Sequence, residues 1–302
     1  MTTPRRLWVA TVTHDATAGA TPAVTADVSS GAPAGSLEYF AVLFASTARR
    51  SDLRALYAFA AEIRRCSALT NHDIAHTRLQ WWRQELDRCF AGDAQHPLTR
   101  TLQTLRPVID PSDLTLLGEL TVAADLDLAA FEYATWSQLA AYCFRATGAL
   151  QTVIAAVLAS PDPLSERERS FARQLGAAVR QVEMLRDIAR DNGNGRCYVP
   201  LEALEGHGLS VAQWFTGSEP GARAALLADW RSRLTAELRA AGSELTSIER
   251  ARQRHGLVLR ALHLRLLDAI RARADENIAV DVPGWGKLWT AWRSAVSAAA
   301  PD

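Results

Sequence analysis

Three carboxylates follow one another at one-turn intervals in the second half of the chain. Glu183, Asp187 and Asp191 are each four residues apart, a spacing that places them on one face of a helix. Like charges at this spacing repel by about 0.2–0.5 kcal/mol per pair, so the row favours a bound cation. Two such carboxylates can share a hard cation such as Mg2+ and leave positions for water and phosphate oxygens. The same spacing also fits a solvated acidic stripe that Arg186 and Arg190 neutralise.

The sequence around this row contains further motifs. A Gly-rich break at 192–195 ends the helix, and the chain continues with Arg196, Tyr198 and Pro200. The segment therefore has the pattern R-D-x-x-x-D followed by G-R-x-Y-x-P. Three earlier segments have distinctive patterns as well, namely A-L-Y-A-F at 55–59, L-Q-W-W-R-Q-E-L at 79–86 and Y-C-F-R-A-T-G at 142–148. In this order the motifs resemble those of the squalene/phytoene synthase family, over residues 37–205.

This resemblance implies an all-α fold, an isoprenoid synthase-like bundle of about ten helices around a central cavity. In that family, aspartate motifs lie on facing walls, and magnesium ions bridge them to the diphosphate of a prenyl substrate. Ionisation leaves an allylic carbocation, and a second prenyl chain is joined to it head to head. The metals would neutralise the leaving group, and apolar walls would keep water from the cation.

The resemblance also assigns roles to individual residues. It implies that Asp187 and Asp191 act in catalysis with Tyr198, and that Glu183 joins the two aspartates as a ligand of Mg2+. The residues expected to bind substrate are Arg64, Arg65, Arg186, Arg196, Tyr57 and Tyr142. The two tyrosines among them also fit plain core packing. The expected partner is a prenyl diphosphate or another isoprenoid lipid.

The first aspartate motif of the family is missing from this chain. Its D-D-x-x-D positions fall on Arg64, Arg65 and Ala68, and only Glu62 nearby is acidic. Two metal-binding carboxylates have thus become guanidinium groups, which reverses the charge of this wall. At an effective dielectric constant near 20, two unit charges 4 Å apart interact by ~4 kcal/mol. The usual magnesium cluster cannot form on such a wall. Upstream of the second motif, the polar positions of the family also change, to Arg180 and Glu183.

Three arrangements of the two arginines remain open. Arg64 and Arg65 can pair with Asp187 and Asp191 across the cavity, which would occupy the space of the lost metals. They can instead hold a diphosphate directly while the aspartates bind one metal, because arginine suits bidentate phosphate contacts. They can also simply be exposed to solvent.

The sequence therefore leaves the activity undecided between two functions. One is a Mg2+-dependent transferase of prenyl groups that acts on isoprenoid diphosphates. The other is a non-catalytic protein on the same fold that binds a lipid or serves as an assembly factor. The second is suggested by a resemblance to a subgroup related to a mitochondrial respiratory complex I assembly factor, whose members are not expected to catalyse the condensation.

Apolar periodicity predicts the helices that must position these residues. Leu53, Leu56, Tyr57, Ala60 and Ile63 form an i, i+3, i+4 stripe that begins after a possible cap at Ser51. Further helices are predicted at 73–92, 111–131, 139–159, 171–191, 220–245 and 247–277. Capping boxes are predicted at 135–138 and 165–168, and Asp73 is predicted to cap the second helix.

A last short helix is expected at 285–299, where Trp285, Trp289 and Trp292 share one face. We expect this face to pack on the body of the protein. The alternative is peripheral contact with a membrane surface or with a partner.

Composition limits the remaining possibilities. Of the 302 residues, 33 are Lys or Arg and 33 are Asp or Glu, and this balance argues against a nucleic-acid-binding surface. Residues 1–36 lack any period and are expected to be a disordered leader, followed by one domain at 37–302. No apolar run of ~18 residues for a membrane span is apparent. We expect a cytoplasmic protein, with the inner membrane as the surface for any peripheral contact.

Overall fold

The computed structural model describes residues 31–273 and 279–299, and within them every regular element is helical. The elements are α1 (Leu37–Leu43), η2 (Thr47–Arg49), α2 (Arg50–Ser67), α3 (His72–Ala91), α4 (Pro97–Gln103), α5 (Pro111–Thr115), η3 (Leu116–Gly118), α6 (Glu119–Leu128), α7 (Trp136–Cys143), η4 (Phe144–Gly148), α8 (Ala149–Ala159), α9 (Glu166–Gly193), α10 (Leu201–Gly206), α11 (Val211–Thr216), α12 (Pro220–Ala240), α13 (Ser247–Arg252), α14 (Arg254–Ala272) and α15 (Gly284–Ala299). The all-α prediction is confirmed. Most of the predicted leader, residues 1–30, lies outside the described residues, and the division at residue 36 stays a prediction.

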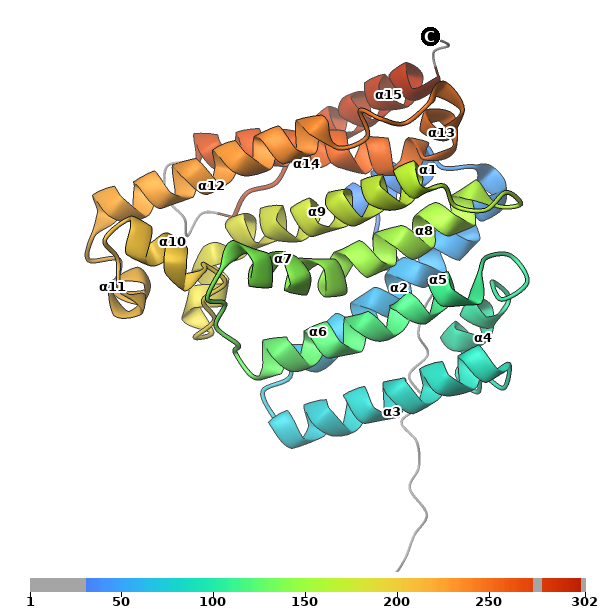
Figure 1. Cartoon of the computed structure of the whole chain (residues 1–302), viewed down its shortest axis with the longest axis horizontal. Helices are drawn as coiled ribbons and strands as arrows, with labels where there is room; N and C mark the ends of the chain where they lie inside the picture. Colours follow the sequence, from blue (N-terminus) through green and yellow to red (C-terminus); the bar gives the residue numbers. More distant parts are fainter. Residues whose placement is uncertain (1–30, 274–278, 300–302) are drawn as a thin grey trace, which may run out of the picture.

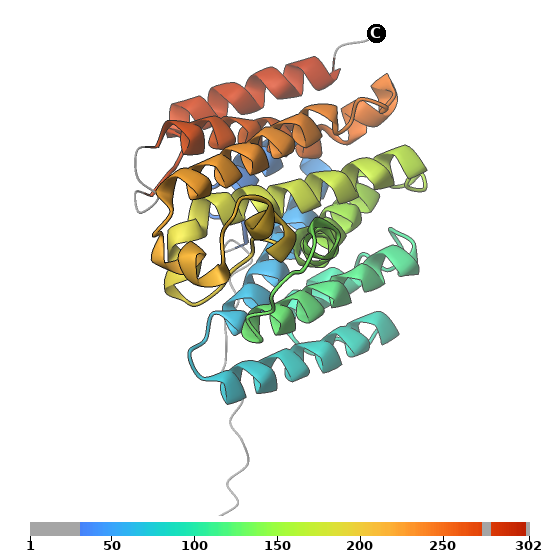
Figure 2. The ribbon, with the colours of Figure 1, turned by 60° about the vertical axis from the view of Figure 1, so that its left-hand side comes forward.

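The helices stack in layers that run roughly across the molecule (Figure 1). Helices α12, α14 and α15 form one end of the stack, α3 and α4 form the other, and α9, α8, α2 and α6 lie between them. Figure 2 shows the same order of layers after rotation. Buried apolar side chains form two clusters, one around α9, α12 and α14 and the other around α2, α3, α6 and α8. The region where these clusters meet contains the candidate site.

Local sequence signals explain where the main helices lie. The predicted apolar stripe of α2 is buried along its whole length, from Leu53 to Ile63. Helix α9 begins with the predicted capping box, in which Ser165 and Glu168 bond each other's backbone N–H groups. Two predicted caps are each wrong by two residues. Asn71 caps α3 in place of Asp73, and α2 begins at Arg50, so Ser51 lies inside it.

Several long predicted helices are divided into shorter ones. The predicted helix 111–131 consists of α5, η3 and α6, and the predicted helix 247–277 consists of α13 and α14. Residues 274–277, the predicted end of the helix 247–277, lie outside the described residues. The segment Trp136–Ala159 runs without a break but contains the π-helical turn η4. Such turns insert one residue per turn and commonly lie at functional sites, and η4 contributes Ala146 and Thr147 to the candidate site.

The segment Trp136–Ala159 also corrects the expectation that no stretch resembles a membrane span. By length and composition it could cross a membrane, but 78% of its most apolar part is buried inside the protein. It is therefore the central core helix of the bundle, surrounded by α2, α6 and α9.

Helix α9 crosses η4 at unusually short range because two glycines face each other there. A Cβ atom built on Gly176 would lie 2.5 Å from the Cα atom of Gly148 and 2.8 Å from its nitrogen, both of which are backbone atoms. Real Cβ atoms do not approach this closely, so a side chain at Gly176 must push the two helices apart.

We expect Gly176→Ala to lower the free energy of unfolding by about 1–3 kcal/mol, which is the usual cost of overpacking. Urea unfolding followed by circular dichroism would measure it. The matched control is Gly193→Ala on the same helix, where a Cβ meets nothing within 4 Å. The control should be neutral or stabilising, because alanine favours helix more than glycine does. Equal stability of the two variants would show that the glycine contact does not set the helix spacing.

The tryptophan-bearing helix α15 lies where it was predicted, but its orientation was predicted wrongly. Trp285, Trp289 and Trp292 are 75%, 55% and 47% exposed. The face of α15 that is buried carries small residues instead, Ala291 and Ala295 among them. The close contact between α14 and α15 leaves room for alanine but not for indole rings.

Candidate functional site

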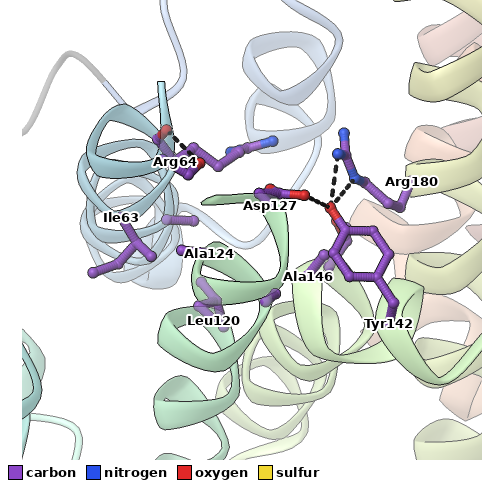
Figure 3. Close-up of a pocket in the computed structure, with 12 residues that line it drawn as sticks. Ile63, Arg64, Leu120, Ala124, Asp127, Tyr142, Ala146 and Arg180 are labelled. Atoms are coloured by element: carbon purple, nitrogen blue, oxygen red, sulfur yellow. Dashed lines mark hydrogen bonds between the residues drawn. The ribbon is translucent and has the colours of Figure 1, made fainter. Parts of the chain in front are cut away.

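A small cavity lies where the two apolar clusters meet. Its volume is about 20 Å3. Its lining residues are Ala60, Ile63, Arg64, Ser67, Leu120, Ala123, Ala124, Asp127, Tyr142, Ala146, Thr147 and Arg180. In Figure 3, Arg64, Asp127 and Arg180 lie on one side of the pocket, while apolar side chains such as Leu120 and Ala124 lie on the other. The cavity thus has a charged rim, which we define as Arg64, Asp127, Arg180 and Glu183.

A buried hydrogen-bond network joins three helices and a loop at this rim. The hydroxyl groups of Tyr142 and Tyr198 both donate to Oδ1 of Asp127, at 2.7 and 2.8 Å. Arg180 donates from Nη2 to the same two hydroxyl oxygens, at 2.9 and 3.2 Å. Burial raises the pKa of Tyr142 well above its ordinary value, and it also raises that of Tyr198. Both phenols therefore stay protonated and serve as fixed hydrogen-bond donors.

Arg180 is the centre of this network. Burial alone lowers the pKa of a guanidinium, but Tyr142, Tyr198 and Asp127 outweigh it and hold the pKa of Arg180 well above its ordinary value. Its guanidinium also lies over the ring of Tyr198, 5.2 Å from the ring centroid. The site therefore contains a permanent buried positive charge.

Glu183 connects the charges of α9 to those of α2. Its carboxylate lies 3.7 Å from Arg64 and 3.6 Å from Arg180, and its side chain is only 8% exposed. Burial raises the pKa of Glu183, but Arg64, Arg180 and Arg186 act against burial and bring the pKa below its ordinary value. Glu183 was predicted to be a metal ligand, whereas in the structure it is the shared partner of two arginines.

Asp187 is held by arginines of its own helix. Arg186 donates Nε to Oδ1 at 2.9 Å and Nη2 to Oδ2 at 2.7 Å, and Arg190 adds a third bond at 2.9 Å. Burial raises the pKa of Asp187, yet these arginines outweigh it and leave the pKa below its ordinary value. Arg186, predicted to bind substrate, is occupied by this bidentate pair.

Asp191 lies one turn further and is less well paired. Its side chain is 9% exposed, and Arg190 lies 3.4 Å from its carboxylate. Burial raises the pKa of Asp191 above its ordinary value, because the charges of Arg190 and Arg180 do not compensate for the lost hydration. The carboxylate row predicted from the sequence is therefore present, but Arg190 bridges its last two members.

Arg64 pairs with Glu183, and Arg65 pairs with Glu62 of its own helix. Of the three arrangements left open by the sequence, the pairing with Asp187 and Asp191 is not observed, although a salt bridge does cross from α2 to α9. The side chains of Arg64 and Arg65 remain 47% and 55% exposed.

These contacts do not fit the magnesium cluster that the resemblance implies. Among residues 31–273 and 279–299, no three His, Cys, Asp or Glu side chains gather closely enough to hold a metal ion. The α2 wall offers guanidinium groups in place of carboxylates, and Asp187 already accepts three hydrogen bonds from arginines. Whether Asp187 and Asp191 bind a single Mg2+ stays a prediction.

Two further predicted residues lie apart from the cavity lining. The hydroxyl of Tyr57 lies 3.1 Å from Nε2 of His255 and accepts a bond from Gln151, inside the core of the bundle. The substrate-binding role predicted for Tyr57 therefore gives way to core packing. Arg196 donates to the carbonyl of Ser67 at 2.8 Å, so it fastens the loop after α9 to the end of α2.

Two residues of the rim were not among the predicted site residues. Asp127 stands in an ordinary amphipathic stretch, L-D-L, and no motif marks it. In the sequence, Arg180 stands out only as a departure from the family pattern. The one available signal was that Arg180 precedes Glu183 by three residues and Asp187 by seven, which places it on the same face of α9.

Solved structures with the same arrangement of helices define the class of this fold. A dehydrosqualene synthase solved in complex with a ligand superposes with a TM-score of 0.70, at 17% identity over 86% of this chain and 90% of that one. The squalene synthase HpnC from Alicyclobacillus acidocaldarius superposes with a TM-score of 0.68, at 22% identity over 81% and 92% of the two chains. The fold is thus that of an all-α isoprenoid synthase, as predicted.

The family follows from the sequence comparison. The model of the squalene/phytoene synthase family matches residues 34–293, and the chain belongs to that family. A 15-cis-phytoene synthase from Synechocystis sp. is 29% identical over an alignment of 198 residues, which covers 59% of this chain and 56% of that protein. The phytoene synthase of Mycobacterium tuberculosis is 26% identical over an alignment of 208 residues, which covers 64% of this chain and 66% of that protein. The chain spans about half the length of the first of these relatives.

Proposed function

We propose that this protein binds a prenyl diphosphate at the charged rim and acts in the head-to-head prenyl transfer class. Membership of the squalene/phytoene synthase family supports the substrate class, and relatives along much of the chain are phytoene synthases. We further propose a cytoplasmic location, with the acceptor prenyl chain taken from a membrane.

One observation carries the proposal. Arg64 stands at the first aspartate position of the family, lines the cavity, and is still 47% exposed. Its guanidinium is therefore available to an anion that approaches the rim, and arginine binds diphosphate oxygens in a bidentate manner. The positive charge that the family obtains from metal ions would here come from side chains.

The remaining residues have definable tasks in such a site. Arg64 and Arg65 would neutralise the charge that develops on the departing diphosphate. The Arg180 network would fix the polar side of the pocket, because each member is held by at least two hydrogen bonds or ion pairs. The apolar side, formed by residues such as Leu120 and Ala124, would exclude water from an allylic cation.

The cavity volume favours a second candidate, a non-catalytic isoprenoid-binding protein. About 20 Å3 holds roughly one water molecule, whereas pockets for small organic ligands measure ~300–1,000 Å3. For catalysis, the helices that line the cavity would have to move apart far enough to hold a full prenyl chain. A protein that binds only the diphosphate end of an isoprenoid has no such requirement.

Turnover with farnesyl and geranylgeranyl diphosphate distinguishes the candidates. The proposal predicts release of inorganic diphosphate together with an apolar product, and loss of both in Arg64→Met. The matched control is Arg190→Met, which removes an exposed arginine of α9 that lies outside the charged rim. This variant should still release inorganic diphosphate. Binding without release would establish the non-catalytic candidate. Absence of both binding and release with either substrate would remove the proposed function.

A further inference from the structure

Helix α15 presents an apolar face to solvent. The face consists of Trp285, Leu288, Trp289, Trp292 and Val296, which follow the i, i+3, i+4, i+7, i+11 spacing of one helical stripe. Each of the five is about half exposed or more. The rings of Trp289 and Trp292 stack on each other with centroids 5.1 Å apart, so they form a continuous surface. Figure 1 shows α15 as the outermost helix of its end of the molecule.

A basic groove runs beside this face, between α14 and α15. Its volume is about 380 Å3, and Trp289 forms part of its wall. Four arginines line it, namely Arg250, Arg260, Arg265 and Arg293. The one acidic residue of the lining, Asp268, lies 3.6 Å from Arg271, which is outside the groove lining.

The groove arginines lack carboxylate partners among the residues that the structure describes. Arg250 and Arg260 donate to the backbone carbonyls of Gly242 and Ala241. Nε of Arg260 is buried and has no hydrogen-bond partner. Burial, followed by the nearby charge of Arg250, lowers the pKa of Arg260. Like charges gathered in this way are relieved by an anion, and the groove is wide enough for a phosphate group.

We propose that the apolar face of α15 and the arginine groove together dock the protein on a membrane that contains anionic phospholipid. The tryptophans would enter the interfacial zone, where indole combines an apolar body with a polar N–H group. A lipid phosphate would occupy the groove, because basic side chains attract anionic headgroups.

The positive charge around the apolar face of α15 favours an anionic membrane as its partner and disfavours a second copy of the chain. Residues 284–299 contain no acidic residue. Their exposed basic residue is Arg293, because Lys287 is buried and pairs with Asp281. Two copies that met through this face would bring the groove arginines of both chains together. An amphipathic helix with tryptophan on one side and basic residues beside it is instead the pattern of a helix that lies in a membrane interface. This inference does not depend on the proposed function.

Sedimentation of the full-length protein with vesicles tests the inference. Vesicles of phosphatidylcholine alone are compared with vesicles of phosphatidylcholine and phosphatidylglycerol. We expect binding to the mixed vesicles, and at least tenfold weaker binding by the Trp285→Ala, Trp289→Ala, Trp292→Ala variant, because affinity follows the apolar area that is buried. The matched control replaces three exposed apolar residues elsewhere, Ile74, Val122 and Phe215, by alanine and should bind like wild type.

A second variant tests the groove. Each basic residue near an anionic surface contributes about fivefold to affinity, so Arg265→Gln with Arg293→Gln should weaken binding about 30-fold. Three results would overturn the inference: equal binding to neutral and mixed vesicles, undiminished binding by the tryptophan variant, or a dimer in light scattering that the tryptophan substitutions dissociate. Unchanged thermal unfolding of each variant confirms that the fold is intact.

Discussion

Arg180→Met is expected to lower the free energy of unfolding by about 3–5 kcal/mol, the cost of breaking a buried ion pair from one side. The methionine fills a similar volume but leaves the carboxylates of Asp127 and Glu183 without their buried cation. Of its two ion-pair partners, Glu183 would keep Arg64, whose side chain is half exposed. The hydroxyls of Tyr142 and Tyr198 would lose the guanidinium that orders them. Urea unfolding monitored by circular dichroism measures the change.

The control for this prediction is Arg190→Met on the same helix. Arg190 also pairs with carboxylates, at 2.9 Å from Asp187 and 3.4 Å from Asp191, but its side chain is 65% exposed. Exposed ion pairs contribute little, so the control should lose less than about 1 kcal/mol. If both substitutions had the same small effect, the Arg180 network would not be the structural centre of the site.

Restoring carboxylates to the α2 wall is expected to give a protein whose stability depends on Mg2+. In Arg64→Asp with Arg65→Asp, the attraction between Arg64 and Glu183 becomes a repulsion. Unit charges about 4 Å apart interact by ~4 kcal/mol at an effective dielectric constant near 20, and the exposure of Arg64 reduces this by half or more. Acidic residues also oppose the dipole at the end of α2. Together these effects predict a loss of about 3 kcal/mol without metal.

Magnesium should then recover part of the loss. Position 64 lies opposite Glu183, and carboxylate oxygens from two walls can hold a hard cation. At about 10 mM Mg2+, a site with a dissociation constant of 0.1–1 mM would contribute roughly 1–3 kcal/mol. The control is Arg64→Met with Arg65→Met, which removes the same charges without adding ligands and should not respond to Mg2+. Thermal unfolding with and without Mg2+ measures both proteins, and a double-aspartate variant that ignores Mg2+ would contradict this account of the wall.

The helices near the site could be predicted from the sequence, because local patterns determine them. The stripe from Leu53 to Ile63 has helical spacing and a single buried face, and the capping box at Ser165 marks the start of α9. The row of Asp187 and Asp191 follows from helix geometry alone. Family motifs supplied the order and the fold class, which spacing could not provide.

The partners of the charged residues could not be predicted, because they depend on the relative position of two helices. Arg64 meets Glu183 and not Asp187, a difference of one helical turn across the gap between α2 and α9. Asp127 carries no motif, and its role arises from its place beside two tyrosines from other segments. The burial of Tyr57 and the exposure of Trp289 have the same origin, since an amphipathic pattern does not say which neighbour covers a face.

Calorimetric titration of the wild-type protein with farnesyl diphosphate, in Mg2+ and again in excess EDTA, tests the replacement of metals by arginine most directly. We expect binding in both solutions, with dissociation constants that agree within about threefold, because side chains supply the positive charge. Binding that disappears in EDTA would contradict it and would show that a metal site forms despite Arg64 and Arg65.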